Sequence, residues 1–213
     1  MCGMYVGEKA EKGRLCPKCL TQLPRTEQAV LRMNSTEDAL QPNKHLKRAA
    51  AFLFFEKEHP IQQVIHQMKY GNQPFIGYHL GRQAAMEFQY TDFFDEIDVI
   101  IPLPLHPKRI RSRGYNQSEY IAKGISEITG IPIDTTHVVR VKDTPKQAQQ
   151  SGEGRKHNVV NAFEVIHPEQ LYHKHILVVD DLITTGETMK ACLKAMNTCR
   201  GATFSVFALC KAK

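Results

Sequence analysis

Two adjacent carboxylates in the C-terminal part of the chain are the first side chains whose types and spacing could do chemistry. Asp180 and Asp181 follow the apolar run ILVV, and a polar turn behind them leads into an amphipathic helix. That turn consists of Thr184, Thr185, Gly186, Glu187 and Thr188. Backbone N–H groups at a helix start have no partner inside the helix, and the helix dipole adds partial positive charge, so the turn can bind a phosphate. Carboxylates beside it can accept hydrogen bonds from ribose hydroxyls and bind Mg²⁺, so the pattern predicts a sugar-phosphate site.

Other classes of protein also end an apolar strand in acidic residues, and the sequence argues against each of them. Receiver domains place the acids on their first strand, whereas Asp180 and Asp181 come after residue 175. A P-loop needs G-x-x-x-x-G-K-[ST], which the sequence does not contain. A purely structural helix N-cap would explain one acid or one threonine and not the whole group.

Positive charge is concentrated in two segments of the chain. The formal net charge of +6 suits an anionic partner, either nucleic acid or a phosphorylated small molecule. The first cluster, in HPKRIRSRGYNQ, contains Lys108, Arg109, Arg111 and Arg113. The second, in KQAQQSGEGRKHN, contains Lys146, Arg155, Lys156 and His157. A solvated basic loop is the alternative explanation for each cluster.

The N-terminal cysteines predict a metal site that the sequence does not complete. Cys16 and Cys19 form a C-x-x-C pair in LCPKC, and Cys2 lies upstream in a polar setting. A structural zinc ion takes four thiolate or imidazole ligands, so one ligand is missing. Either it precedes Met1, or another residue such as His45 supplies it, or the knuckle is vestigial. Cys192, Cys199 and Cys210 lie in or after an apolar helix, where we expect core packing.

Strands and helices alternate along most of the chain, which predicts an α/β fold with a parallel sheet. Expected strands cover residues 49–55, 97–104, 137–141, 161–166, 175–180 and 202–210. Four helices are expected. The first begins at Pro60, and the second carries Leu80, Ala84 and Phe88. The third carries Ile121, Ile125 and Ile128, and the fourth follows Gly186. The Pro- and Arg-rich segment after the strand at 97–104 and the Gln-rich run 142–158 are expected to be loops.

The same pattern suggests three parts: a partial zinc-knuckle segment at 1–25, a linker at 26–47 and the α/β domain at 48–213. No run approaches the roughly 18 to 20 apolar residues of a membrane span. The N-terminus also lacks an apolar stretch of signal-peptide length. We therefore expect a soluble, cytoplasmic protein with no membrane partner.

Several segments carry a resemblance to a known family. VVDDLITTGET resembles the phosphoribosyl pyrophosphate (PRPP) motif of type I phosphoribosyltransferases. Nearly the whole chain resembles the competence protein F (ComF, also GntX-like) family, in the cysteine knuckle, VIHQMKYGNQ, IPLPLHPKRIRSRGYNQSEYIAKGI and TPKQAQQSGEGRKHNVVNAF. The most family-specific element is R-G-[FY]-N-Q, here Arg113, Gly114, Tyr115, Asn116 and Gln117.

This resemblance implies roles for the remaining segments. It implies a type I phosphoribosyltransferase-like sheet flanked by helices, with PRPP and Mg²⁺ as ligands, zinc as a second metal and a homodimer as the assembly. Asp180 and Asp181 would hold the ribose and Mg²⁺, and the turn 184–188 the 5′-phosphate. Pyrophosphate would lie against Pro104, Leu105, His106, Lys108 and Arg109. The loop 142–158 would close over PRPP through Gln149, Arg155 and Asn158, unless it is an idle surface loop.

The implied reaction is displacement at the anomeric carbon of PRPP by a nitrogen nucleophile, with release of pyrophosphate. Hypoxanthine-guanine enzymes carry a carboxylate where Thr184 stands, so that acceptor class is disfavoured and no general base is evident. Two other functions stay open: a non-catalytic PRPP or nucleotide sensor, and an adaptor for DNA-processing or competence proteins. Aromatic residues do not alternate with the basic ones, and Tyr115 is the only aromatic residue within the two clusters. This argues against direct binding of single-stranded DNA.

Overall fold

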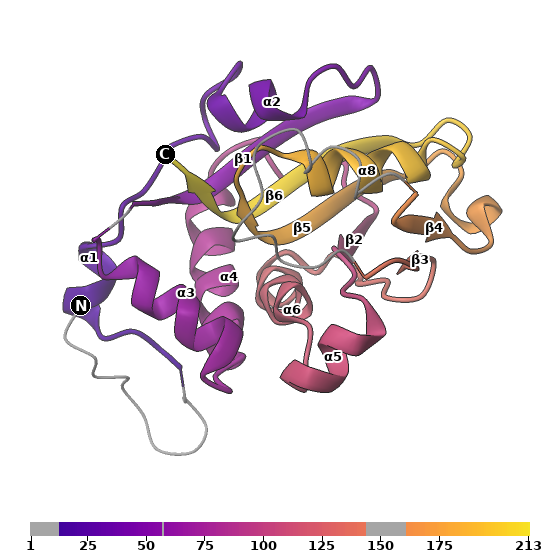
Figure 1. The fold of residues 1–213 in the computed structure, drawn as a ribbon. Coiled ribbons are helices and arrows are strands. Elements are labelled where there is room, and N and C mark those ends of the chain that lie inside the picture. The colour runs from indigo at the N-terminus through magenta and orange to yellow at the C-terminus, as the bar shows by residue number, and fades with distance from the viewer. Residues whose placement is uncertain (1–12, 57, 144–160) are drawn as a thin grey trace.

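The computed structural model describes residues 13–56, 58–143 and 161–213. Within these residues the chain builds a four-stranded parallel sheet in the order β1-β6-β5-β2 (Figure 1). Its strands are β1 (Leu46–Phe55), β2 (Val99–Pro102), β5 (His175–Ile183) and β6 (Thr203–Ala212). A separate antiparallel pair joins β3 (Val138–Arg140) to β4 (Phe163–Val165).

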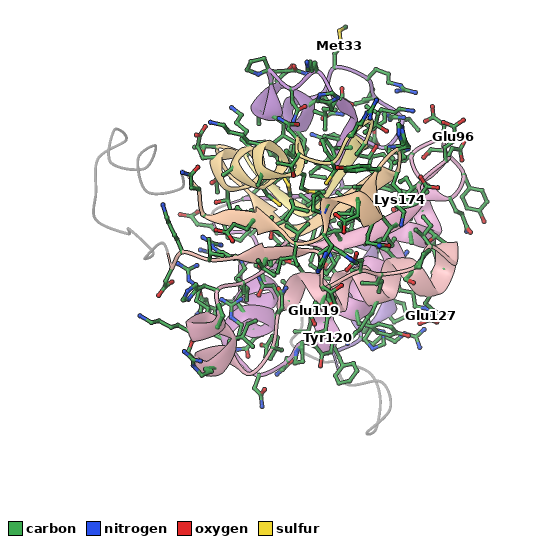
Figure 2. All side chains as sticks on the ribbon, turned by 90° about the vertical axis from the view of Figure 1, so that its right-hand side faces the viewer. Met33, Glu96, Glu119, Tyr120, Glu127 and Lys174 are labelled. Carbon is green, nitrogen blue, oxygen red and sulfur yellow. The ribbon has the colours of Figure 1, made fainter. Side chains whose placement is uncertain are left out.

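Helices cover both faces of the parallel sheet. They are α1 (Pro17–Thr21), α2 (Ser35–Leu40), α3 (Ile61–Tyr70), α4 (Phe75–Phe88), α5 (Pro107–Arg113), α6 (Gln117–Thr129) and α8 (Glu187–Met196), with the 3₁₀ turn η1 (Pro168–Leu171). Apolar side chains of α3, α4 and α6 fill the core on one face, and those of α2 and α8 fill it on the other. Figure 2 shows this division, with Met33 before α2 at one side and Tyr120 and Glu127 of α6 at the opposite side. No helix in the described ranges is long and apolar enough to cross a membrane.

The central strands are apolar throughout because both of their faces are covered. Ile176, Leu177, Val178 and Val179 of β5 are all buried, and consecutive residues of this run enter opposite cores. Burial on both faces explains why a parallel strand reads as a continuous apolar run rather than as an alternating one.

Several predicted boundaries differ from the structure by a few residues, and two differences have a clear cause. The Pro- and Arg-rich segment expected to be a loop contains helix α5, which starts with Pro107 at its first position and ends at Gly114 in the left-handed region (φ 88°). Proline at a helix start and glycine just past its end are favourable, so the loop prediction was wrong there. The strand expected to end at Asp180 continues to Ile183, because β6 pairs with it as far as Ile183 and Lys211.

The edge strand β1 is covered by the segment that precedes it. Residues 24–36 run alongside β1 and satisfy its outward backbone groups, through Thr26 N to Phe52 O (3.1 Å), Ala51 N to Gln28 Oε1 (3.0 Å) and Asn34 Nδ2 to Ala49 O (2.9 Å). Helix α2 lies within the predicted linker 26–47, and its residue Leu40 is buried in the core. The division into 1–25, 26–47 and 48–213 stays a prediction.

Candidate functional site

The acidic pair lies next to the point where the edge strand β2 ends and β5 and β6 continue. Strand β2 pairs with β5 only as far as Pro102 and Val179, whereas β6 continues beside the acids, with Asp180 opposite Ala208. Asp180 and Asp181 therefore sit just beyond the carboxyl end of β2, beside strands that run further. Ligands of open α/β sheets bind at this edge.

Asp181 is a buried carboxylate with one cationic partner in direct contact. Lys69 of α3 places its Nζ 2.8 Å from Asp181 Oδ1, with side-chain exposures of 18% for Lys69 and 6% for Asp181. The other oxygen, Oδ2, is buried and has no hydrogen-bond partner among the described residues. A buried carboxylate oxygen without a partner is costly, so Asp181 is suited to receive a further donor or a cation.

Asp180 has a different environment from its neighbour. Burial, together with the adjacent Asp181 charge, raises the pKa of Asp180 to about 7, although Lys69 opposes this. Two donors face its Oδ1, the Ser118 hydroxyl at 3.2 Å and the Asp181 backbone N–H at 2.7 Å. Two adjacent buried carboxylates disfavour each other's charge, so Asp180 holds its proton to a higher pH than an exposed aspartate does.

The segment Arg113 to Gln117 ties both acids to the surrounding helices. The Tyr115 hydroxyl donates to the Met68 carbonyl at 2.6 Å, which fixes the end of α3 one residue before Lys69. Asn116 donates to the Leu103 carbonyl at 3.1 Å and accepts from the Ser118 backbone N–H at 3.1 Å, which starts α6. One side of the segment thus positions the partner of Asp181, and the other positions the partner of Asp180.

The remaining residues of this segment shape its turn. Gly114 has φ 88° and nothing near its missing side chain, so backbone conformation rather than space requires the glycine. The Arg113 side chain hydrogen-bonds to Gln117 and lies over the ring of Tyr70, 5.2 Å from its centroid. Burial lowers the pKa of Arg113, whereas the charge of Asp181 raises it.

A basic cleft of about 620 Å³ opens beside the acidic pair. It is lined by Lys69, Tyr70, Asn72, Lys108, Arg109, Ser112, Arg113, Tyr115 and Asp143. Four of these side chains are cationic and one is a carboxylate, whose Oδ1 lies 3.3 Å from Arg109 Nε. This excess of positive charge next to two acids can bind a polyanion that also carries hydroxyl groups.

The turn between β5 and α8 requires a glycine because its backbone is left-handed and because its neighbours leave no room for a side chain. Gly186 has φ 81°, and a Cβ there would lie 2.6 Å from the Ala39 carbonyl oxygen and 3.2 Å from Leu40 Cδ2. Thr184 and Thr185 are exposed beside it, and the Thr184 carbonyl accepts from Lys211 Nζ at 2.8 Å. The start of α8 is thus open to solvent on one side and rests on α2 on the other.

Comparison with known proteins identifies the family. The family described as Phosphoribosyl transferase domain matches residues 110–213. DNA utilization protein YhgH of Shigella flexneri is 32% identical over 155 residues, which cover 71% of this chain and 67% of that protein. Competence protein F of Haemophilus influenzae is 31% identical over 157 residues, covering 72% and 69%. The chain belongs to the competence protein F family.

The likeness of this ComF-family chain to solved structures is more distant. Glutamine PRPP amidotransferase from B. subtilis, complexed with ADP and GMP, is 20% identical with a TM-score of 0.40. The match covers 61% of this chain and 25% of that one, whereas the chain spans about two thirds of the curated relatives above. The type I phosphoribosyltransferase fold predicted from the sequence is confirmed by the matched domain together with the helix-covered parallel sheet.

The structure brings together some of the predicted site residues of this ComF-family chain and separates others. Lys108 and Arg109 line the basic cleft, whereas Pro104, Leu105 and His106 do not, and the His106 ring accepts from the Lys108 N–H at the start of α5. Thr184 lines a second cleft of about 540 Å³. The predicted loop contacts Gln149, Arg155 and Asn158 lie outside the described residues, as does Cys2.

The zinc prediction stays untested in this ComF-family chain. Cys16 is partly buried beside α1, and Cys19 is buried within it. Within the described ranges no group of three or more His, Cys, Asp or Glu side chains could hold a metal ion. Cys192, Cys199 and Cys210 are buried in the core.

Lys69 and Ser118, the two side chains that contact the acidic pair, were not predicted as site residues. Lys69 follows the buried Ile65 by four residues on α3, so it lies on the helix face that packs against the core. A lysine is unusual on such a face. That position was a detectable signal. Ser118 directly follows the Arg113 to Gln117 segment, but its contact with Asp180 depends on tertiary packing.

Proposed function

We propose that this protein binds PRPP with Mg²⁺ and transfers its 5-phosphoribosyl group to a nitrogen acceptor, with release of pyrophosphate. The observation that carries the proposal is the position of the acidic pair. Asp180 and Asp181 lie between a glycine-dependent helix start and a cleft with four cationic side chains. PRPP carries a phosphate, vicinal hydroxyls and a pyrophosphate, so the three parts of this site match its three polar groups.

Each part of the site has a distinct role in the proposed reaction. The free N–H groups at the start of α8 bind the 5′-phosphate, and the acids accept hydrogen bonds from the ribose hydroxyls. Lys108 and Arg109 face the pyrophosphate and offset the charge that develops on it as it leaves. The rate enhancement comes from positioning and electrostatic stabilisation, because the described site offers no evident base for the acceptor.

The side chains at the acidic pair fit a magnesium ion. Mg²⁺ prefers carboxylate and phosphate oxygens, and Asp181 Oδ2 is a buried acceptor with no partner among the described residues. Asp180 and Asp181 would hold the ion through ribose hydroxyls or directly. When bound, it would supply charge compensation for the departing pyrophosphate.

Calorimetric titration with PRPP in the presence of Mg²⁺ tests the binding step. We expect binding by the native protein and a loss of at least about tenfold in affinity for Asp180→Asn, since an amide is a weaker acceptor for a hydroxyl than a carboxylate. Asp95→Asn, which changes an exposed aspartate away from the site, serves as the matched control and should bind as the native chain does. Absence of PRPP binding by the native protein would refute the proposal.

Pyrophosphate release distinguishes an enzyme from a sensor. We expect PRPP-dependent release with at least one member of a panel of nitrogen acceptors, at a rate that falls in Asp180→Asn. Binding of PRPP with no release across the panel would leave the sensor function in its place. We also propose that the N-terminal cysteines bind zinc, which metal analysis of the full chain tests. We further propose a homodimer, which light scattering tests.

A second function, in DNA handling, is favoured by helix α5. This helix buries none of its residues and carries Lys108, Arg109, Arg111 and Arg113. The structure adds an aromatic ring that the sequence pattern did not place near α5, because Tyr70 is 49% exposed and lies against Arg113. Cations beside exposed aromatic rings suit single-stranded nucleic acid.

Fluorescence anisotropy with a single-stranded oligonucleotide at increasing salt tests this second function. We expect affinity to fall steeply with salt and to weaken in Arg111→Gln, which leaves PRPP binding unchanged because Arg111 does not line the basic cleft. Binding that is absent, or equal in the variant and the native chain, would exclude α5 as a DNA surface.

A further inference from the structure

Lys69 stands between the two halves of the site. Its Nζ contacts Asp181 Oδ1 at 2.8 Å, and the same side chain lines the basic cleft with Lys108 and Arg109. A lysine side chain has a flexible four-carbon stem and a compact charge, so the ammonium group can turn from the acids toward the cleft that the same side chain lines.

The surrounding structure holds Lys69 in this place. The hydrogen bond from the Tyr115 hydroxyl to the Met68 carbonyl fixes the last turn of α3. Gly71 closes the helix through its N–H to the Gln67 carbonyl at 2.8 Å. The backbone of Lys69 is therefore fixed while its side chain can reorient, which is the arrangement expected of a counter-ion that changes partners.

We propose that Lys69 and a divalent cation compete for Asp181, so that the acidic pair accepts the metal together with PRPP and not alone. This inference rests on the proposed function. Mg²⁺ bound at Asp181 Oδ2, the oxygen with no partner among the described residues, would share one carboxylate with an ammonium group 2.8 Å from Oδ1, and the two cations would repel each other. Moving a partly buried ammonium group away from its carboxylate without a new partner is unfavourable, whereas pyrophosphate in the cleft offers one. Lys69 then binds the pyrophosphate that PRPP brings.

The test compares Lys69→Met with the native protein in two binding experiments. Methionine is of similar length and uncharged, so it removes the competing cation with little loss of packing. Mn²⁺ titration followed by electron paramagnetic resonance, at pH 8.5 without PRPP, should give about tenfold tighter metal binding in the variant. Calorimetry with PRPP in saturating Mg²⁺ should give about tenfold weaker PRPP binding.

Matched variants exclude a merely structural role for Lys69. Lys123→Met changes an exposed lysine of α6 that faces the Tyr120 ring, and should leave both affinities unchanged. Lys69→Arg keeps the charge and should keep Mn²⁺ binding weak. Asp181→Asn combined with Lys69→Met should abolish the gain in Mn²⁺ affinity. Denaturation curves verify that each variant is folded.

Each outcome decides a separate part of the inference. Unchanged or weaker Mn²⁺ binding by a folded Lys69→Met overturns the competition. Tighter Mn²⁺ binding with unchanged PRPP affinity keeps the competition and overturns the transfer of Lys69 to pyrophosphate. If the native protein binds no PRPP, the proposed function fails, and the Mn²⁺ experiment alone decides whether Lys69 and a metal compete.

Discussion

A methyl group added at Gly186 should loosen the proposed phosphate-binding turn between β5 and α8 and its contact with α2. In Gly186→Ala the new Cβ would lie 2.6 Å from the Ala39 carbonyl oxygen and 3.2 Å from Leu40 Cδ2. The left-handed backbone at φ 81° adds a cost of about 1–2 kcal/mol for any residue with a side chain. Overpacking against a backbone carbonyl adds about 1–3 kcal/mol, because α2 and the turn must move apart. We expect a loss of about 2–5 kcal/mol in the free energy of unfolding.

Gly130→Ala is the matched control for this substitution. Gly130 also has a positive φ, 73°, but nothing lies within 4 Å of its missing side chain. It should therefore lose only the backbone cost of about 1–2 kcal/mol. The difference between the two variants measures the contact of the turn with α2.

Urea denaturation and PRPP calorimetry on both variants provide the measurement. We expect Gly186→Ala to weaken PRPP binding by at least about tenfold, because its N–H groups no longer converge on one phosphate, and Gly130→Ala to bind as the native chain does. Equal stabilities in the two variants would show that α2 does not press on the turn. Equal PRPP affinities would show that this turn is not the phosphate site.

Three further predictions concern hydrogen bonding and pH. Tyr115→Phe should lower the free energy of unfolding by about 1–3 kcal/mol in urea denaturation, because the Met68 carbonyl loses its partner. The folded state keeps Asp180 protonated between its ordinary pKa of 3.8 and about 7, so stability falls as pH rises through this window and stays reduced above it. With a chelator present, the free energy of unfolding of Asp180→Asn relative to the native protein should therefore be about 2 kcal/mol more favourable at pH 8.5 than at pH 5.5. This figure is 1.36 kcal/mol for each pH unit between 5.5 and about 7. An equal difference at both pH values would contradict the raised pKa. Burial lowers the pKa of His175, so its stabilising effect is complete above the ordinary 6.5 and declines as pH falls; a thermal scan should show a smaller acid loss in His175→Gln than in the native chain.

Local patterns in the sequence predicted the elements that carry the proposed site. The apolar run before Asp180 and the glycine at residue 186 predicted strand β5 and helix α8, because burial on both faces and a left-handed turn leave plain signatures. The amphipathic spacing of Ile61, Val64, Ile65 and Met68 predicted helix α3 in the same way, and all four are buried.

Contacts between distant segments could not be predicted in the same way. The pairing of Lys69 with Asp181 depends on how α3 packs over the end of β5, and no local pattern records it. The same is true of the close approach of Ala39 to Gly186, through which the predicted linker supports the turn between β5 and α8. Helix α5 was mispredicted for another reason. Its many charged residues are typical of a loop, although Pro107 and Gly114 mark the start and end of a helix.

The cover on strand β1 has a consequence for aggregation. Strand β1 is ten residues long, lies at the edge of the sheet and has six buried residues in its middle. An uncovered edge strand of this length and composition is a template on which another chain can add a strand. A shortened chain that starts at residue 48, at the predicted domain boundary, would lose the segment that occupies Ala49, Ala51 and Phe52. The segment before the sheet thus covers the edge along which β1 could pair with another chain, and we expect a chain without it to aggregate.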